Sequence, residues 1–155
     1  QLLDDDEWVL WIDIDVCDLE PDVLRKLLAA REKIVTPDCV LDRGGPSFDL
    51  NTYLETGSPR RSEFFKYVTA GLFQPSLDYW RRLHIHDMRF ASKVPLTAVG
   101  GTMLLVHGSI HRAGLVFPEA PYRYLIETEA FGRMARDAGV VPYGLPDIEV
   151  VHVKS

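Results

Sequence analysis

The stretch Trp8–Val16 carries two carboxylates, Asp13 and Asp15, separated by one residue. It is rich in β-branched and aromatic residues and predicts a buried strand. Side chains two residues apart in a strand point to the same side, so these carboxylates can converge on one cation or one polyol. Open α/β sheets bind ligands at the carboxyl ends of their strands, and a divalent cation there would offset the charge of a bound diphosphate. The two aspartates alone leave two other interpretations open: they are simply solvated, or they cap the helix that follows.

Neither the H-x-H pair nor the cysteines of this chain predict a further metal site. His84 and His86 form an H-x-H pair, but the sequence offers no third ligand nearby, so we expect both on the surface. Cys17 and Cys39 lack both the C-x-x-C spacing and the histidine neighbours of a zinc site. Two cysteines also do not make a disulfide scaffold, so the redox compartment stays open.

The composition predicts one globular domain over residues 1–155. The chain is 46% hydrophobic and 26% charged, which allows a core and argues against disorder. Its net charge of -6 gives no electrostatic footprint for nucleic acid or an anionic membrane. No run approaches the roughly 20 apolar residues of a membrane span, and the first residues do not resemble a signal peptide.

The elements after the acidic pair predict a β-α-β unit. Apolar residues recur at helical spacing over Val23–Arg31, and Lys33–Leu41 is an apolar strand. Pro37 within that strand favours a position at the sheet edge or an early end of the strand. Glycines, prolines and little periodicity predict a long loop over Asp42–Ser62, of a length that is usually functional or mobile. Within it, Phe48–Glu55 places polar groups at alternate positions, unless these serve turns.

The second half of the chain predicts further strands and helices. Phe64–Phe73 is ambiguous between helix and strand, and Ser76 is the expected cap of a short helix. Gly100 and Gly101 precede a core strand, Met103–Val106, and allow close approach of the backbone to another strand or a ligand. The remaining expected elements are two helices, Ser109–Leu115 and Thr128–Gly139, and two extended segments, Val140–Leu145 and Ile148–Val153.

Six motifs, in the correct order along the chain, resemble the fungal Golgi mannan polymerase subunits, the α-mannosyltransferases of glycosyltransferase family 62. They are WVLWIDIDV, FDLNTYLET, PLTAVGGTMLLV, SIHRAGLVFP, YLIETEAFGRMARDAG and VPYGLPDIEVVHV. Because they span nearly the whole chain, the resemblance is far more specific than a lone D-x-D. It implies an α/β fold of the GT-A type, a Rossmann-like nucleotide-sugar domain. The chain begins almost at the D-x-D strand, so we expect the C-terminal part of such a domain without its N-terminal β/α units.

The resemblance also implies a divalent cation, usually Mn²⁺, against the diphosphate of GDP-mannose. By position, Asp15 would bind the metal directly, and Asp13 would bind the ribose or the metal's waters. His152 would be the late ligand that closes the site, although by itself it would be taken for an ordinary strand residue. Two carboxylates and an imidazole suit Mn²⁺ better than Mg²⁺, which prefers oxygen ligands alone.

Glu127 and Glu129 match the acidic pair of the family near the acceptor site. Either could accept a hydrogen bond from the attacking hydroxyl or stabilise positive charge on the sugar, and Glu129 is the first choice. The competing interpretation is that they cap the helix and favour its dipole. Gly100 and Gly101 would form the loop beside the donor sugar.

The resemblance assigns a polar rim to the long loop and has three departures. Asp49, Asn51 and Glu55 would face sugar hydroxyls. The departures from the family pattern are Thr97 in place of an acid, Tyr53 in place of a tryptophan, and Ala130 in place of a glycine. Thr97 matters most, because a lost carboxylate could change sugar contacts or mark an inactive paralogue.

The function that the resemblance implies is a retaining α-mannosyltransferase of mannan or N-glycan outer-chain synthesis. Its donor would be GDP-mannose, its acceptor an α-mannose oligosaccharide, and its partners paralogous subunits rather than nucleic acid. The full protein would be a type II membrane protein of the Golgi lumen. The alternative is a non-catalytic scaffold subunit of the polymerase complex. A metal-dependent phosphohydrolase is weaker, because the sequence supplies neither a phosphorylated nucleophile nor a second metal cluster.

Overall fold

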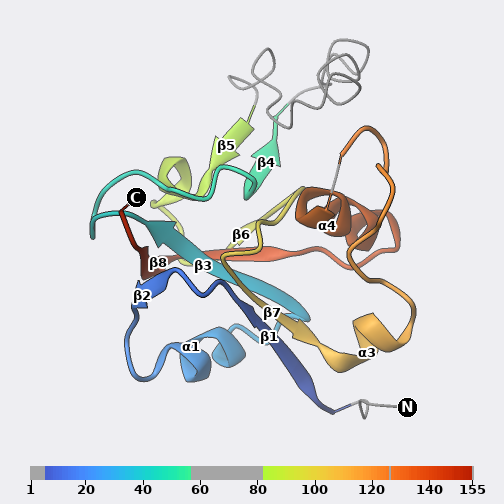
Figure 1. Cartoon of the computed structure of the whole chain (residues 1–155), viewed down its shortest axis with the longest axis horizontal. Coiled ribbons are helices and arrows are strands. Elements are labelled where there is room, and N and C mark those ends of the chain that lie inside the picture. Colours follow the sequence, from blue (N-terminus) through green and yellow to red (C-terminus); the bar gives the residue numbers. More distant parts are fainter. Residues whose placement is uncertain (1–5, 57–81, 126, 155) are drawn as a thin grey trace.

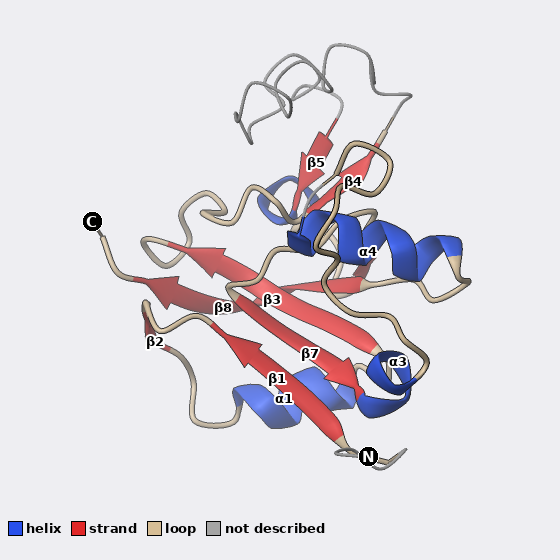
Figure 2. Ribbon diagram, turned by 45° about the vertical axis from the view of Figure 1, so that its right-hand side comes forward, coloured by secondary structure: helices blue, strands red, loops and turns tan. Residues whose placement is uncertain are grey.

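The computed structural model describes residues 6–56, 82–125 and 127–154 and has a mixed sheet with helices on both faces (Figures 1 and 2). The expected α/β class is thereby confirmed. The segment expected at Phe64–Phe73 lies outside the described residues. So does the short helix expected after Ser76, except for its last residues, which fall within the described range 82–125. None of the described helices is long and apolar enough to cross a lipid bilayer.

The described elements form one main sheet, one small sheet and four helical segments. The main sheet contains β1 (Trp8–Ile12), β2 (Val16–Asp18), β3 (Ile34–Val40), β6 (Val94–Pro95), β7 (Met103–His107) and β8 (Tyr143–His152). The small sheet pairs β4 (Tyr53–Glu55) with β5 (Arg82–His84). The helical segments are α1 (Val23–Ala29), the 3₁₀ helix η2 (Ile85–Met88), α3 (Gly108–Arg112) and α4 (Glu127–Asp137).

The main sheet has the strand order β1-β7-β3-β8-β2, with β6 paired to β8. β3 and β8 are parallel, whereas the other pairs are antiparallel. Since β7 is antiparallel to both β1 and β3, these two strands run in the same direction. The expected β-α-β unit therefore exists, but β7 lies between its two strands.

Side chains that alternate along the central strand β7 pack into two separate hydrophobic cores. Leu104 and Val106 of β7 pack with Phe131 of α4 on one face. Met103 and Leu105 of the same strand pack with Leu27 of α1 on the other face. This is the two-residue period of a strand covered on both sides, and it explains why β7 reads as a continuous apolar run. Figure 2 shows α4 and α1 on opposite sides of the sheet.

The expected buried strand Trp8–Val16 is wrong in two respects. β1 ends at Ile12, and Asp13–Asp15 form a turn in which the Val16 amide donates to the Asp13 carbonyl, 3.1 Å away. β1 is also an edge strand of the described sheet, with Trp11 and Ile12 41% and 47% exposed. An apolar run alone does not distinguish an edge strand from a central one.

The expectation that Pro37 marks a sheet edge is also wrong, because β3 is central and every residue in it is buried. The pairing of β3 with β7 involves Ile34 and Val35, and the register with β8 shifts between Pro37 and Asp38. Pro37 thus lies beyond the pairing of β3 with β7 and beside an irregularity in the pairing with β8, where a sheet tolerates proline.

The same irregularity joins the two expected C-terminal segments into one strand. Leu145 pairs with Pro37 and Glu149 pairs with Asp38, so the three residues between them on β8 bulge out of the ladder. Pro146 lies in this bulge, which explains how β8 continues through a proline. The helix before it ends as expected, since Gly139 has a φ of +87°.

Gly132 lets α4 approach the backbone of the segment between β6 and β7 closely. A Cβ at Gly132 would lie 2.8 Å from the Val99 amide nitrogen and 2.9 Å from the Ala98 Cα. Both are backbone atoms, so the contact cannot be relieved by a side-chain movement. The helix therefore needs a glycine here despite its low helix propensity.

We expect Gly132→Ala to destabilise the protein by about 1–3 kcal/mol, because overpacking against backbone outweighs the roughly 1 kcal/mol that alanine gains in helix propensity. Urea unfolding measures the change. Gly101→Ala is the matched control, since its new methyl would meet only the Thr128 Cγ2, at 3.1 Å. A Gly132→Ala protein as stable as the wild type would contradict the proposed close approach.

Candidate metal centre and adjoining pocket

The D-x-D carboxylates converge through a turn rather than through strand alternation. The Asp13 amide donates to the Thr102 carbonyl at 2.9 Å, which continues the β1–β7 pairing by one residue. The Asp15 amide donates to Asp13 Oδ1 at 3.2 Å. Both carboxylates remain exposed, so their outer oxygens are available to a ligand.

His152 reaches the same turn from the end of β8. Val16 of β2 pairs with His152, and the Val153 amide donates to the Asp15 carbonyl at 2.9 Å. His152 Nε2 lies 3.8 Å from Asp13 Oδ2 and 4.0 Å from Asp15 Oδ2. One possible ligand atom from each of the three residues lies within 4.8 Å of the others.

The hydrogen bonds of His152 favour the tautomer that a metal ligand needs. Nδ1 lies 2.8 Å from the Val153 carbonyl oxygen, which can only accept, so Nδ1 carries the proton in the neutral ring. The lone pair is then on Nε2, the atom that faces the two carboxylates. The residues present therefore fit a divalent cation, and their mixed nitrogen and oxygen donors suit Mn²⁺.

A polar pocket of about 470 Å³ adjoins these carboxylates. Five of its lining residues belong to the predicted site: Asp13, Asp49, Asn51, Gly101 and Glu127. Phe48, Leu50, Thr102 and Thr128 complete the lining. Residues from four distant parts of the chain therefore surround one hollow beside the D-x-D turn.

Gly100 makes room for a carboxylate of the protein itself. A Cβ at this position would lie 1.8 Å from Asp49 Oδ2, and the Gly100 amide donates to Thr52 Oγ1 at 2.8 Å. Asp49 also accepts from Thr102 Oγ1 at 3.0 Å. Burial is the largest influence on Asp49 and raises its pKa. The close approach that the paired glycines predict is thus made to Asp49, whereas Gly101 lines the pocket.

The two glutamates of α4 lie in different surroundings. Glu127 is exposed and lines the pocket. Glu129 is 4% exposed, is not among the lining residues, and accepts a hydrogen bond from the Tyr53 hydroxyl at 3.1 Å. Burial raises the pKa of Glu129 to about 7. Of this pair, Glu127 has the direct access to a ligand in the pocket.

Two other residues from the sequence analysis lie apart from the pocket lining. Glu55 Oε2 is 3.4 Å from Arg133 Nη1 of α4. Thr97 is 3% exposed, and its hydroxyl accepts from the Glu55 amide at 3.0 Å. The departure at Thr97 therefore changes a buried contact rather than the pocket lining.

The expectation that His84 and His86 are surface residues is wrong for His84, which is 2% exposed. Its Nδ1 lies 3.3 Å from the Thr52 carbonyl oxygen. His86 is partly buried, and its Nδ1 accepts from the Ser47 amide at 2.9 Å. Each histidine contacts a loop residue more than 30 positions earlier in the sequence and so connects two separate segments of the chain.

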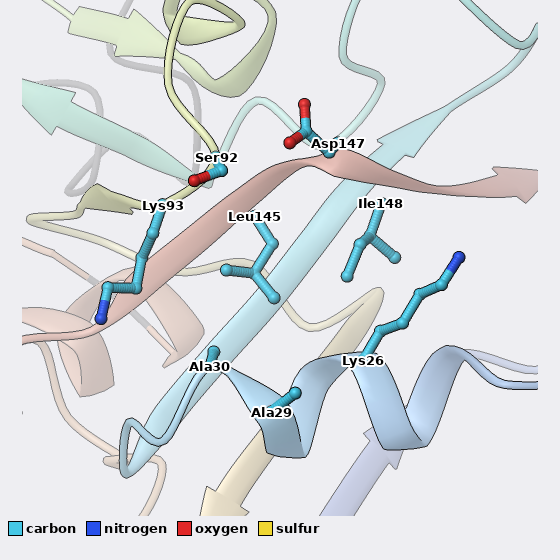
Figure 3. Close-up of a pocket in the computed structure, with 8 residues that line it drawn as sticks. All are labelled: Lys26, Ala29, Ala30, Ser92, Lys93, Leu145, Asp147 and Ile148. Carbon is cyan, nitrogen blue, oxygen red and sulfur yellow. The ribbon is translucent and has the colours of Figure 1, made fainter.

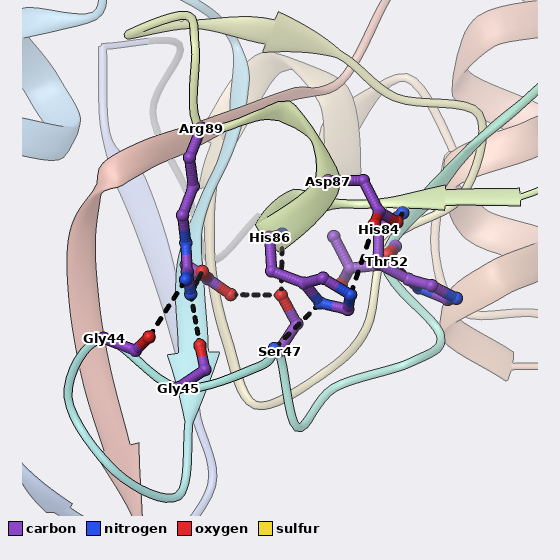
Figure 4. Close-up of polar contacts among 9 residues, drawn as sticks. Gly44, Gly45, Ser47, Thr52, His84, His86, Asp87 and Arg89 are labelled. Carbon is purple, nitrogen blue, oxygen red and sulfur yellow. Dashed lines mark hydrogen bonds and ion pairs between the residues drawn. The ribbon is translucent and has the colours of Figure 1, made fainter.

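A network that the sequence analysis missed joins β3 to the long loop (Figure 4). Asp38 is fully buried, accepts from the Ser47 hydroxyl at 2.6 Å, and pairs with Arg89 at 2.9 Å. Arg89 also donates to the carbonyls of Gly44 and Gly45. Phe48, the next residue after Ser47, has its ring against His152. The glycines and prolines of Asp42–Ser62 indicated the loop, but no sequence signal indicated these contacts.

Another pocket, of about 440 Å³, lies between α1 and β8 and has a different character (Figure 3). Its lining includes the apolar side chains of Ala29, Leu145 and Ile148. The lysines beside it, Lys26 and Lys93, form ion pairs with Glu20 and Glu32. This pocket lacks the convergent carboxylates of the first one.

The fold and these contacts define a mixed α/β protein with a candidate cation site beside a polar pocket. Comparison with known sequences identifies the family: a model of the Anp1 family matches residues 1–121, and the chain belongs to this family, which is that of the fungal mannan polymerase subunits.

The chain is similar to several curated relatives over 94% or more of its length. It is 31% identical to the "Mannan polymerase complex subunit mnn9" of Schizosaccharomyces pombe and covers 45% of that protein. It is 26% identical, over 97% of its length, to the subunit MNN9 of Candida albicans, again covering 45%. It is 29% identical to the "Mannan polymerase I complex VAN1 subunit" of Saccharomyces cerevisiae and covers 29%. The chain thus spans less than half the length of these relatives.

The raised pKa of Glu129 predicts that stability falls as pH rises. Below about pH 4.5 the carboxyl is protonated in both the folded and the unfolded chain, and its contribution is fully present. Between about 4.5 and 7 the unfolded chain releases the proton and the folded chain keeps it, so the free energy of unfolding decreases by at most about 3 kcal/mol.

We expect Glu129→Gln to remove this part of the pH dependence while keeping an acceptor for Tyr53. Urea unfolding between pH 4.5 and 8 measures it. The exposed Glu127→Gln is the matched control and should keep the wild-type slope. An unchanged slope in Glu129→Gln would show that Glu129 releases its proton at the same pH in the folded and the unfolded chain.

Proposed function

We propose that this chain is the metal-binding part of a GT-A mannosyltransferase. In this proposal it transfers mannose from GDP-mannose to an α-mannose oligosaccharide, with retention of the α configuration, in mannan or N-glycan outer-chain synthesis. The observation that carries the proposal is the convergence of Asp13, Asp15 and His152 beside a polar pocket. Membership of the mannan polymerase subunit family supports the pathway and the sugar.

The proposed roles follow from where each side chain lies. Asp15 and His152 hold Mn²⁺ or another divalent cation, and Asp13, which also lines the pocket, holds the cation's waters or the ribose. A bound cation would offset the negative charge of the diphosphate as it leaves. Asp49 and Asn51 offer acceptors and donors to sugar hydroxyls.

Glu127 is the residue that we propose for contact with the reacting groups. It lies on the pocket, where its carboxylate can accept a hydrogen bond from the attacking hydroxyl or stabilise positive charge on the sugar ring. Glu129 is buried, lies outside the pocket lining and accepts a hydrogen bond from the Tyr53 hydroxyl, so we propose no contact with the reacting groups for it. This reverses the order of the two glutamates given by the sequence alone.

The second candidate function is a non-catalytic scaffold subunit of a polymerase complex. The names of the relatives support membership of a complex, which this role shares with the catalytic one, since each describes a subunit of a mannan polymerase complex. Under either function we propose that paralogous subunits are partners and that the full protein is anchored in the Golgi membrane with this part in the lumen. The two functions differ in whether the D-x-D turn is needed for synthesis.

Asp15→Ala in the full protein distinguishes the enzyme from the scaffold. We expect Mn²⁺-dependent transfer from GDP-mannose to an α-mannoside to fall by on the order of a hundredfold or more, because a cation ligand worth several kcal/mol is lost. Product analysis by mass spectrometry measures transfer, and co-purification of subunits measures assembly. Asp147→Ala, an exposed carboxylate beside the other pocket, is the control. Unchanged synthesis with intact assembly would favour the scaffold.

His152→Ala tests the third ligand separately from turnover. We expect Mn²⁺-dependent GDP binding to weaken by about tenfold to a hundredfold, because one ligand is removed while Asp15 and the diphosphate remain. Calorimetry of GDP binding with and without Mn²⁺ measures the difference. Equal Mn²⁺-dependent affinities for variant and wild type would reduce the cation site to the D-x-D turn.

A further inference from the structure

An aromatic ring lies directly on the imidazole of the candidate metal centre. The ring centroids of Phe48 and His152 are 4.4 Å apart, with 33° between the ring planes. Phe48 is nevertheless 42% exposed, so the ring is not placed there by burial in the core. A single exposed apolar side chain is ordinary, so it is the contact of the Phe48 ring with the proposed cation ligand that bears on the site.

The contact between Phe48 and His152 restricts the rotation of the imidazole ring. The backbone of His152 is fixed by β8, and Nδ1 has its partner at the Val153 carbonyl. Rotation of the ring about its last side-chain bond would turn Nε2 away from the two carboxylates. A ring packed on the face of the imidazole opposes this rotation, as packing locks the rotamers of ligands in other sites.

The position of Phe48 is itself fixed from the backbone. Its amide donates to the Cys39 carbonyl of β3 at 2.6 Å. The residue before it, Ser47, is held on both sides: its hydroxyl donates to Asp38 and accepts from the His86 amide at 3.0 Å, and its own amide donates to His86 Nδ1 (Figure 4).

Arg89 completes this anchor at the start of the loop. It pairs with the second oxygen of Asp38 and donates to the carbonyls of Gly44 and Gly45. Asp38 is fully buried, so breaking this network would leave a buried carboxylate without its partners, which is strongly unfavourable. The loop is therefore held firmly at the residue that precedes Phe48.

We propose that Phe48 is a positioning residue for the cation site, which holds the His152 imidazole with Nε2 toward Asp13 and Asp15, and that the Ser47, Asp38 and Arg89 network holds Phe48 in turn. The inference rests on the cation site of the proposed function. Phe48 does not touch the cation. Its effect is to keep one ligand in the binding orientation before the cation arrives.

Cation affinity in the absence of nucleotide and acceptor tests the proposal. Mn²⁺ binding to the full protein is measured by the electron paramagnetic resonance of free Mn²⁺ for wild type, Phe48→Ala, Phe48→Tyr, His152→Ala and the double variant Phe48→Ala/His152→Ala. We expect Phe48→Ala to weaken binding about tenfold, the size of effect typical of residues behind a metal ligand. Phe48→Tyr keeps the ring and should stay within about twofold of wild type.

The double variant separates positioning of His152 from any other role. If Phe48 acts through His152, removing Phe48 has no further effect once His152 is alanine, and the double variant binds Mn²⁺ like His152→Ala alone. Phe90→Ala, which removes a ring that is 86% exposed, is the matched control. Circular dichroism and thermal unfolding verify that each variant is folded.

Three results would overturn the inference. Wild-type affinity in Phe48→Ala shows that the ring does not position the ligand. A tenfold loss that persists in the His152→Ala background shows that Phe48 acts on something else. Finally, if the wild type does not bind Mn²⁺, or if Asp15→Ala leaves Mn²⁺ binding unchanged, these residues do not form a cation site. The proposed metal dependence is then wrong as well. The first two results leave the proposed function standing.

Discussion

The antiparallel pairing of β2 with β8 is the contact on which the candidate site depends. Val16 pairs with His152, and the Val153 amide donates to the Asp15 carbonyl. These contacts join residues separated by more than 130 positions and bring an imidazole within 4.0 Å of two carboxylates. β2 has three residues and β8 has ten, so the position of β8 is set mainly by its longer parallel pairing with β3. The geometry of the site therefore depends on the central strands of the sheet.

Elements with a strong local pattern were predictable from the sequence. The α4 helix has apolar residues at helical spacing and a glycine at its end, and the structure places it at Glu127–Asp137. The core strand β7 is apolar throughout because helices cover both of its faces. What failed were properties set by distant pairing: the edge position of β1, the central position of Pro37 and the burial of His84. Local patterns carry no information about which strand becomes the neighbour.

The candidate site was predictable to the extent that its residues are adjacent or follow a family pattern. Asp13 and Asp15 were visible as a D-x-D, although a turn and not a strand aligns them. His152 came only from resemblance, because a single histidine in an apolar strand has no local signature. The Asp38, Ser47 and Arg89 network was invisible, since its members come from β3, the long loop and the end of η2. Such a buried polar network is recognised only once the fold brings its members together.

The contact between Gly100 and Asp49 also has an evolutionary consequence. The carboxylate of Asp49 fills the volume that any side chain at position 100 would need, with atoms 1.8–2.2 Å from where its Cβ would begin. Position 100 is then not free to change alone: a larger residue there is compatible only with a smaller or reoriented residue at 49. In a lineage that diverges, position 100 should therefore gain a side chain only after position 49 has changed, and the polar character of the pocket wall changes with position 49.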